Sequence, residues 1–412
     1  MVEGEDYDLV IVGGGMVGAS LAIALGGSSL RIALLEAMPF RADGQPSYDD
    51  RAIALAYGTH RIFAGMGLWD ILRDETTPIR SIHISDRGHF GFTRLDCRDE
   101  GVEALGYVAV SRAMGAVLAE RLEQLPNVEV LCPATVTNVV IGSDHAEVVI
   151  NGDEAPRRLT ARLVVAADGA TSQVREWLGI DTLRWEYDQT AVITNITPER
   201  AHCNRAFERF TNSGPLALLP MGNNRCSVVW TVRGNRAHEV MSLEDTLFLN
   251  ALQERFGTRL GSFLRVGKRH AYPLKLVRAE EHVRPRLALI GNAAHTLHPV
   301  AGQGFNLGLR DVAVLAEVLN GAAMDGRDIG ALDVLQTYAR WRRRDHIKMI
   351  AFTDGLARVF ANPLAPLRAL RNVGLLTVDV IPPLKHALTR HTMGLAGKLP
   401  RLARGLPLVG TS

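Results

Sequence analysis

The sequence has 412 residues, a formal net charge of +2, 47% hydrophobic residues and 22% charged residues. This length exceeds what one hydrophobic core usually supports, so we expect two intertwined domains, and the near-neutral charge argues against a nucleic-acid-binding protein. The four cysteines share no C-x-x-C spacing, which is typical of reduced thiols in a cytoplasmic protein and favours neither a disulfide framework nor a zinc site.

The N-terminal segment predicts a strand, a tight turn, a helix and a second strand. Residues 7–12 are a short apolar run, residues 19–25 are helix formers, and residues 31–35 are a second β-type run that ends at Glu36. This order indicates one βαβ unit of a parallel sheet. The uncharged stretch 9–27 approaches transmembrane length, but acidic residues precede it and glycines cluster in it, which favours a buried strand and helix.

The pattern changes twice farther along the chain. A helix over residues 112–124 and strands over 128–131, 146–150 and 163–166 are expected first. From about residue 185 to 276 the runs are short, β-rich and separated by turn residues, which predicts an antiparallel sheet with strands at 191–196, 206–210, 216–220, 226–232 and 268–274. The chain then returns to the first domain through a strand at 287–291 and a helix from about 304 to 319.

The last sixty residues are basic and interrupted by prolines. From residue 356 onward, eight Lys or Arg residues stand against one acid, Asp379, and apolar residues are interleaved with them. Such a segment can lie on an anionic membrane surface, or it can be a solvated helical cap on the core. The pattern leaves both interpretations open.

A glycine motif follows the first expected strand and opens the first expected helix. Gly13, Gly15 and Gly18 have G-x-G-x-x-G spacing, which permits a tight turn and a close approach of the backbone to a pyrophosphate. The helix N-terminus offers unpaired N–H groups to the phosphates. Glu36 lies near the spacing of a carboxylate that accepts hydrogen bonds from a ribose diol. The motif predicts a dinucleotide cofactor but does not separate FAD from NAD.

Two later motifs carry a resemblance that distinguishes FAD from NAD. Residues 162–175 end a strand with Asp168 and Gly169, and residues 286–291 form a strand that leads to a glycine-rich stretch at 302–304 and a helix. Together with the segment after Arg51, these motifs resemble the fingerprints of the class A flavoprotein monooxygenases, the group of p-hydroxybenzoate hydroxylase. The resemblance covers nearly the whole chain.

The resemblance implies an α/β fold in which an FAD-binding, Rossmann-like domain of the p-hydroxybenzoate hydroxylase type carries an inserted antiparallel β-sheet domain for the substrate. The expected FAD-binding domain comprises residues 1–75, 101–182 and 277–355. The expected substrate domain comprises residues 76–100 and 183–276. Residues 356–412 are expected to form a basic helical C-terminal region.

The resemblance also implies FAD as cofactor and NAD(P)H as a transient co-substrate, since no second glycine fingerprint follows another strand. Backbone N–H groups at the 302–304 helix start would face the pyrimidine edge of the flavin, and Pro299 would flank the position where O2 adds. No metal is expected. The expected cofactor-binding residues are Gly13, Gly14, Gly15, Met16, Val17, Gly18, Glu36, Arg51, Arg112, Val136, Asp168, Gly291, Asn292, Pro299, Gly302, Gln303, Gly304, Phe305 and Asn306.

Asn292 departs from the usual family pattern, which has Gly-Asp where this chain has Gly291 and Asn292. Asparagine keeps an oxygen acceptor but loses the charge, and a charged hydrogen bond contributes roughly 1.5–3 kcal/mol against about 1 kcal/mol for a neutral one. We expect FAD to bind with somewhat lower affinity. Protein that lacks flavin and is not reconstituted by added FAD would contradict this expectation.

Within this group, several blocks are similar to hydroxylases of ubiquinone biosynthesis. The similarity implies that O2, through a C4a-hydroperoxyflavin, hydroxylates a 2-polyprenyl-6-methoxyphenol para to its hydroxyl group. The inner face of the cytoplasmic membrane and other ubiquinone-biosynthesis proteins are the implied surroundings. The blocks are residues 50–56, 84–91, 205–211, 214–221, 267–274 and 291–294.

Such a reaction requires the protein to position the ring, exclude water and assist loss of the phenolic proton. The candidate catalytic residues are Pro299 and Gly302 beside the flavin and Arg209, Tyr272 and His89 in the substrate segments. For these three, and also for His83, His295 and His298, a structural polar side chain is the favoured interpretation. An apolar passage for the polyprenyl tail, or simply part of the core, is expected from Phe207, Phe210, Leu216, Leu218, Leu219, Val228 and Trp230.

Three other functions stay open at this point. A related ubiquinone-pathway hydroxylase could act at another ring position. A flavin dehydrogenase or reductase of an isoprenoid lipid would share the fold, and substrate-dependent O2 consumption would separate it from an oxygenase. A lipid-binding or scaffold subunit without turnover is disfavoured by the intact Arg51, Asp168 and Gly302.

Overall fold

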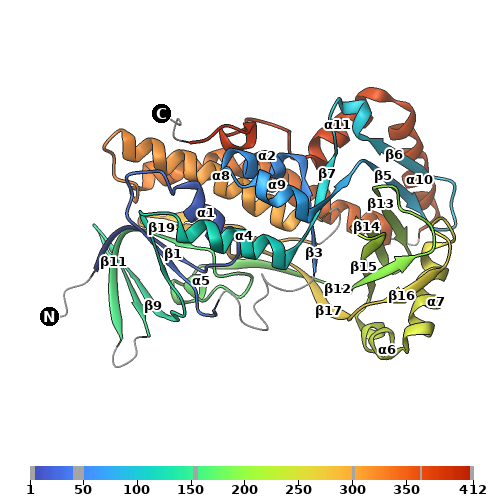
Figure 1. Cartoon of the computed structure of the whole chain (residues 1–412), viewed down its shortest axis with the longest axis horizontal. Helices are drawn as coiled ribbons and strands as arrows, with labels where there is room; N and C mark the ends of the chain where they lie inside the picture. Colours follow the sequence, from blue (N-terminus) through green and yellow to red (C-terminus); the bar gives the residue numbers. More distant parts are fainter. Residues whose placement is uncertain (1–4, 40–50, 152–155, 299–301, 362–363, 409–412) are drawn as a thin grey trace.

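The computed structural model describes residues 5–39, 51–151, 156–298, 302–361 and 364–408. Figure 1 shows two lobes. One contains a sheet covered by long helices, and the other contains a second sheet beside α10 (Ala365–Val380) and α11 (Pro382–Thr392). The strands β12 (Thr182–Pro198) and β17 (His270–Ala279) run from one lobe to the other.

The first sheet contains the βαβ unit expected at the N-terminus. β1 (Glu5–Val12) pairs in parallel with β2 (Ile32–Leu35) and β11 (Arg157–Ala166). The strand order is β18-β19-β11-β1-β2-β8, and β10 and β9 fold back in antiparallel pairing beside β11. The further bounds are β8 (Val128–Leu131), β9 (Val136–Ile141), β10 (Ala146–Ile150), β18 (Val283–Arg284) and β19 (Leu287–Leu289).

The helices α1, α4 and α8 cover one face of this sheet, and β9, β10 and α5 pack against the other face. Because both faces are buried, the strands are continuous apolar runs. Leu9 and Ile11 have no exposed surface, so the uncharged N-terminal stretch is interior, as expected. Among the described residues, no helix is both long and apolar enough to cross a membrane. The helices of this lobe are α1 (Met16–Ala24), α2 (Tyr57–Gly65), α3 (Trp69–Leu72), α4 (Ser111–Glu123), α5 (Gln173–Trp177), α8 (Gln303–Met324) and α9 (Leu332–Ala361).

A small sheet connects the two lobes. β7 (Gly106–Val110) lies between β3 (Ala52–Ala56) and β4 (Thr76–Ile79), and both pairings are antiparallel. β3 also contacts the start of α8, so the small sheet lies beside the first turn of that helix.

The second sheet has the order β20-β17-β12-β15-β14-β13-β5-β6, and β16 pairs with β12. The strands expected between residues 185 and 276 pair antiparallel, as predicted. The structure adds a parallel pairing between β13 (Arg205–Thr211) and β5 (Ser81–Asp86), a strand that the sequence pattern did not indicate. These two strands are far apart in sequence, and no hairpin fixes their relative direction. The other elements are β6 (Phe92–Asp96), β14 (Gly214–Met221), β15 (Arg225–Arg233), α6 (Ala237–Ser242), α7 (Asp245–Phe256), β16 (Phe263–Val266) and β20 (His295–Thr296).

Two of the sheet's strands are longer than the sequence pattern indicates. β12 begins at Thr182 and β17 extends to Ala279, and these outer parts pair with each other. The expected domain boundaries near residues 182 and 276 therefore fall on paired strands, and the division into domains stays a prediction.

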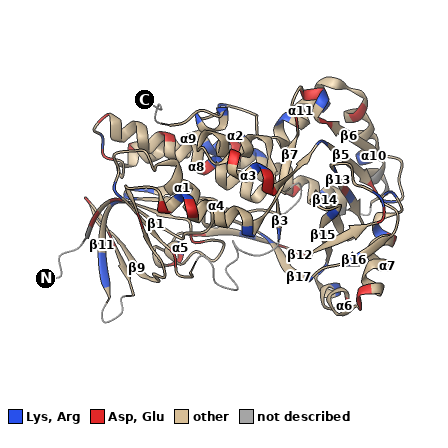
Figure 2. Ribbon diagram, in the orientation of Figure 1, with Lys and Arg blue, Asp and Glu red and all other residues tan. Residues whose placement is uncertain are grey.

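The C-terminal helices pack on the second sheet through buried polar contacts. Arg371 of α10 donates from Nε to Asp86 Oδ2 at 2.8 Å, and Asn372 donates to the same oxygen at 3.0 Å. Asn372 also accepts from the backbone N–H of Gly91 at 2.9 Å. The C-terminal region is therefore helical and packed on the second sheet, and its contact with a membrane stays a prediction. Figure 2 shows charges of both signs dispersed over both lobes.

Candidate active site

A cleft of about 760 Å³ lies where the parallel strands of the first sheet end. Gly13 follows β1, Glu36 follows β2 and Asp168 follows β11, and residues after parallel strands meet at one edge of a sheet. The cleft is lined by many of the residues expected to bind the cofactor: Gly13, Gly15, Met16, Val17, Glu36, Arg51, Val136, Asp168, Gly291, Asn292, Gly304 and Phe305.

The glycine turn has no room for side chains. Gly13 has φ +102°, and a Cβ there would lie 2.6 Å from the Ala167 carbonyl oxygen. A Cβ on Gly18 would lie 1.9 Å from the Gly13 carbonyl oxygen. Gly14 donates its backbone N–H to Glu36 Oε2 at 2.8 Å, so Gly14 and Gly18 shape the turn without lining the cleft. No side chain caps α1, and its first N–H groups are available to phosphates.

Asp168 presents an unsatisfied acceptor to the cleft. Its Oδ2 accepts from the Val174 N–H at 3.2 Å, whereas its Oδ1 is buried and has no hydrogen-bond partner. Burial raises the pKa of Asp168 against the opposing hydrogen bond from Ser172. A buried acceptor without a partner is unfavourable, and a cofactor hydroxyl group would satisfy it. The cleft therefore fits a dinucleotide such as FAD.

An apolar cavity of about 440 Å³ adjoins the cleft. Its walls include the second sheet and the C-terminal helices. Within the wall, the ring of Phe210 on β13 stacks on that of Phe360 on α9, with ring centroids 3.5 Å apart. α10 and α11 contribute Leu375 and Leu388 to the wall, a role that the sequence pattern did not reveal. Six residues line both the cleft and the cavity: Ala52, Ile53, Ile193, Asn292, Gly304 and Phe305.

The first turn of α8 lies at this junction. Gly302 caps the helix with φ +62°, and a Cβ there would lie 2.9 Å from Ala54 Cβ. Asn306 Oδ1 accepts from Ala56 N and from Thr59 Oγ1, both at 2.7 Å, while its Nδ2 donates to the carbonyl oxygens of Ala54 and Gly302. The Asn306 side chain thus fixes β3 to the helix start, and Gln303 lines the cavity.

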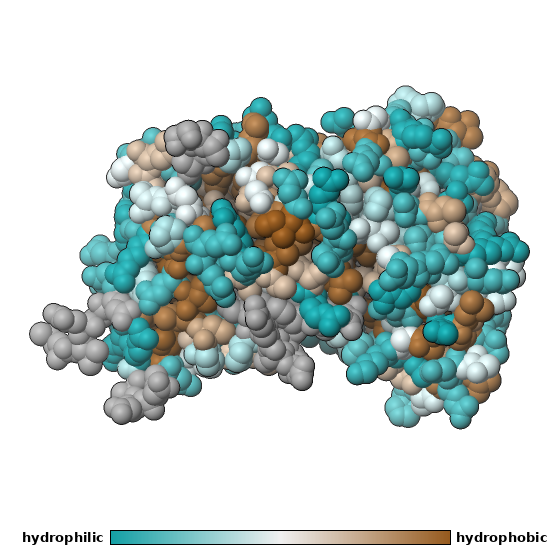
Figure 3. Space-filling model, viewed as in Figure 1, coloured by the Kyte–Doolittle hydropathy of each residue, from teal (hydrophilic) through white to brown (hydrophobic). Residues whose placement is uncertain are grey.

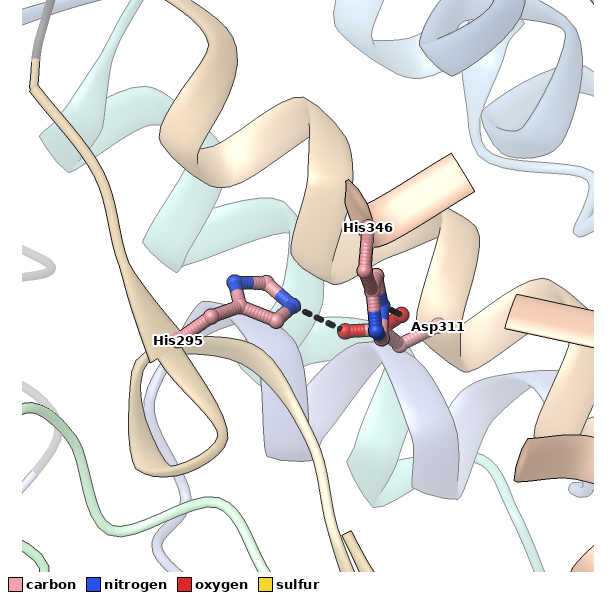
Figure 4. Close-up of side chains that lie close together, drawn as sticks. All are labelled: His295, Asp311 and His346. Atoms are coloured by element: carbon pink, nitrogen blue, oxygen red, sulfur yellow. Dashed lines mark hydrogen bonds and ion pairs between the residues drawn. The ribbon is translucent and has the colours of Figure 1, made fainter. Parts of the chain in front are cut away.

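A buried polar cluster holds the preceding loop to the helices. Figure 4 shows His295 and His346 pointing at Asp311, with His Nε2 to carboxylate oxygen distances of 2.7 and 2.6 Å. Arg342 Nε lies 2.7 Å from the same carboxylate, and Gly291 N donates to it at 3.3 Å.

The charges in this cluster balance without a metal ion. Burial alone would raise the pKa of Asp311, but His346, Arg342 and His295 hold it well below its usual value. Burial lowers the pKa of His346 to about 3, although Asp311 opposes this effect. Since the Arg342 guanidinium already neutralises Asp311, the cluster fits an ion-pair hub better than a metal centre.

The structure does not bring the expected polar catalytic residues to the cavity. Arg209 of β13 points to the side of α7, where a Cβ on Gly257 would lie 3.6 Å from its Nη1. His89 is exposed in the loop after β5. Tyr272 lies outside the cavity, with its ring under the Arg51 guanidinium at 5.1 Å. Their expected roles stay predictions.

Of four further expected residues, the structure describes three. Arg112 is exposed on α4 and does not line the cleft, and Pro299 lies outside the described residues. His298 hydrogen-bonds Gln189 at 3.2 Å, as expected of a loop histidine. His83 is buried between Phe92 and Phe207. It lies on the face of β5 opposite to that of Ile82 and Ile84, which line the cavity.

The sequence pattern distinguished residues that line the cavity from core residues only in part, and it did not indicate that a carboxyl group lies in the cavity. Of the expected apolar passage, Phe210 and Leu219 line the cavity, and Leu216, Leu218, Val228 and Trp230 pack in the core beneath α7. Phe207 borders both, because it lines the cavity and also packs on Phe256 of α7. Glu208, between two of the singled-out residues, also lines the cavity. The alternation along β13 could have indicated it, but both faces of this strand are buried.

Comparisons with known proteins agree with this geometry. The family model described as an FAD binding domain matches residues 6–353. The ubiquinone hydroxylase UbiL of Rhodospirillum rubrum is 41% identical over 404 residues, which cover 97% of this chain and 93% of that protein. The 3-demethoxyubiquinol 3-hydroxylase of Escherichia coli is 33% identical over 397 residues, which cover 95% and 99%.

This chain belongs to the FAD-dependent aromatic monooxygenases of the ubiquinone hydroxylase family. The fold of this monooxygenase is also that of p-nitrophenol 4-monooxygenase PnpA from Pseudomonas putida, with a TM-score of 0.80, 22% identity and coverage of 96% and 99% of the two chains. FAD is the cofactor of the family, and NAD(P)H is its typical co-substrate. The expectations of an FAD-dependent monooxygenase and of its fold are confirmed.

Proposed function

We propose that this monooxygenase hydroxylates a 2-polyprenyl-6-methoxyphenol para to its hydroxyl group, using NAD(P)H and O2. The observation that carries the proposal is the meeting of the cofactor cleft with an apolar cavity at Gly304 and Phe305. A cavity of this character suits an aromatic ring with a hydrocarbon tail. The relatives named as ubiquinone hydroxylases support a substrate of this class.

Different residues of the cleft would bind different parts of FAD. The Gly13–Gly15 backbone and the α1 N-terminus would bind the pyrophosphate, and Glu36 and Asp168 would accept from cofactor hydroxyl groups. The first turn of α8 would face the ring. When bound, FAD would supply the redox chemistry, which is acceptance of a hydride from NAD(P)H and transfer of one atom of O2 to the substrate. The apolar walls would exclude water from that step.

The ring position is tested with purified protein, NAD(P)H, O2 and three phenols. We expect 2-polyprenyl-6-methoxyphenol to gain one oxygen atom para to its hydroxyl group, as determined by mass and NMR. The 2-polyprenylphenol and the demethoxyquinol should react more slowly. Faster reaction of either would assign the protein to the alternative, a related hydroxylase acting at another position, as one relative is named a 3-demethoxyubiquinol 3-hydroxylase. NAD(P)H oxidation without substrate-dependent O2 consumption would indicate a flavin reductase.

We further propose that α10 and α11 contact an anionic membrane surface. Exposed apolar side chains follow one side of this helix pair, namely Leu370, Val373, Val380, Ile381 and Leu384. Figure 3 shows apolar groups at the upper right of the visible face, where Figure 1 places these helices. The excess of basic residues after residue 356 complements anionic lipids.

The membrane proposal predicts cosedimentation of the protein with phosphatidylglycerol vesicles and weaker binding to phosphatidylcholine vesicles. The double variant Leu370→Asp/Val373→Asp should bind about 10-fold or more weakly, because two apolar side chains no longer enter the lipid. Met324→Asp is the matched control, since Met324 is exposed at the end of α8 in the other lobe. Equal binding by all three proteins would contradict the proposal.

A further inference from the structure

One carboxyl group lies in the apolar cavity without a protein partner. Among the described residues that line the cavity, Glu208 is the only one with an ionisable side chain. Within the same part of the chain, its carboxylate forms no hydrogen bond or ion pair. Burial in these surroundings raises its pKa to about 7. A carboxyl group in apolar surroundings is unfavourable for folding, so its presence there points to a role in the cavity.

The position of Glu208 is set by strands on both sides. In the register of the sheet, Glu208 is opposite Ala217 of β14 and Ile84 of β5, and all three residues line the cavity. Ala217 is small, which leaves space beside the carboxyl group. The same cavity reaches Gly302 and Gly304 at the start of α8, where the flavin ring is expected. The carboxyl group and the start of α8 therefore face the same cavity.

The charged groups that the structure describes on the neighbouring elements do not form an ion pair with this carboxyl group. On β5 and α10, Asp86 and Arg371 are buried in a pair with each other. On the opposite face of the second sheet, Arg209 has its pKa lowered by burial and by Arg259, and His83 has its pKa lowered to about 4 by burial and neighbouring arginines. From α9, the side chains that line the cavity are the apolar Phe352, Leu356 and Phe360.

We propose that Glu208 is the catalytic base of the hydroxylation. Its carboxylate accepts the hydrogen bond of the phenolic O–H and takes up the proton, which leaves a neutral carboxylic acid and a phenolate. The electron density of the phenolate makes the para carbon more nucleophilic, and as this carbon bonds to the transferred oxygen atom the phenolate oxygen becomes a ring carbonyl. Release of the para C–H proton restores the aromatic ring, and the carboxylic acid returns its proton to the ring oxygen. This role rests on the proposed phenol hydroxylation and adds to it the identity of the base.

The test compares the wild type, Glu208→Gln and the control Glu186→Gln, which changes an exposed glutamate of β12 in the same sheet. The FAD-loaded proteins are assayed with a short-chain 2-prenyl-6-methoxyphenol between pH 5.5 and 8.5. In the wild type and the control, kcat/KM should rise with an apparent pKa near 7, because the deprotonated carboxylate is the active form. In Glu208→Gln, kcat should fall about 100-fold and this rising limb should disappear.

FAD content and the rate of flavin reduction by NAD(P)H should be equal in the three proteins. Because the folded-state pKa of Glu208 lies above its unfolded value, ionisation destabilises the native state as pH rises through 7. The Tm advantage of Glu208→Gln over the wild type should therefore be larger at pH 8.5 than at pH 5.5, a readout without turnover. This measurement also shows that the variant folds.

The two proposals fail in different ways. Hydroxylation by Glu208→Gln at the wild-type rate and with the wild-type pH profile overturns the role of Glu208 but leaves the proposed function intact. Absence of phenol hydroxylation in the wild type overturns the proposed function and with it the role of the base. A loss of activity with an unchanged pH profile also overturns the assignment, because a merely structural role would have that result.

Discussion

Replacement of Gly18 by alanine should abolish stable FAD binding in a protein that still folds. Alanine has the higher helix propensity, so local preference favours the change. The new Cβ, however, would lie 1.9 Å from the Gly13 carbonyl oxygen, and the phosphate-binding turn must move. We expect FAD affinity to fall at least about 100-fold, which corresponds to roughly 2.7 kcal/mol. Titration of the apoprotein with FAD, followed by flavin fluorescence, measures this loss.

Gly321→Ala is the matched control for this prediction. Gly321 is a helical glycine of α8, and a Cβ there would meet no atom within 4 Å. This variant should bind FAD as the wild type does. Wild-type affinity in Gly18→Ala would show that the cofactor does not depend on the turn between β1 and α1.

Replacement of Asp311 by asparagine should have the largest effect on stability. Asp311 is fully buried and accepts hydrogen bonds from two histidines, from Arg342 and from the Gly291 turn. The variant leaves Arg342 buried without its main counter-charge. Loss of one partner of a buried ion pair typically costs about 3–5 kcal/mol. Urea unfolding of the FAD-free proteins gives the difference in the free energy of unfolding.

Asp325→Asn provides the comparison for Asp311→Asn, because Asp325 is exposed at the end of the same helix. Its free energy of unfolding should match that of the wild type within experimental error. Equal stability of Asp311→Asn and the wild type would mean that the cluster in Figure 4 does not hold the Gly291 turn in place.

Local patterns identified the cofactor region because its signals are close together in sequence. The turn at Gly13 follows directly from β1, and Glu36 follows from β2, so their proximity needs only one βαβ unit. The first turn of α8 was also identified, because a glycine-rich stretch before a helix is typical of backbone that approaches a ligand closely. Arg112 shows the limit of this reasoning, since a residue at the start of a helix need not point toward the cleft.

Residues facing the cavity could not be separated from core residues in the same way. The strands β13 and β14 are buried on both faces, so their alternation does not show which side chains face a cavity and which face α7. Arg209 was therefore expected to face the substrate, whereas its neighbour Glu208 is the residue that lines the cavity. The closure of the cavity by Phe360, Leu375 and Leu388 depends on packing between segments more than a hundred residues from β13.

The sequence by itself thus determined the dinucleotide-binding turn and the loops around the cofactor, because these depend on short-range geometry imposed by glycines and strand ends, and the resemblance of its motifs to a known family added the fold class and the choice of FAD. The tertiary structure alone decided which carboxyl group lies in the cavity and which helices close it. Those features arise where distant segments pack together, and only that packing removes a side chain from water and shifts its chemistry.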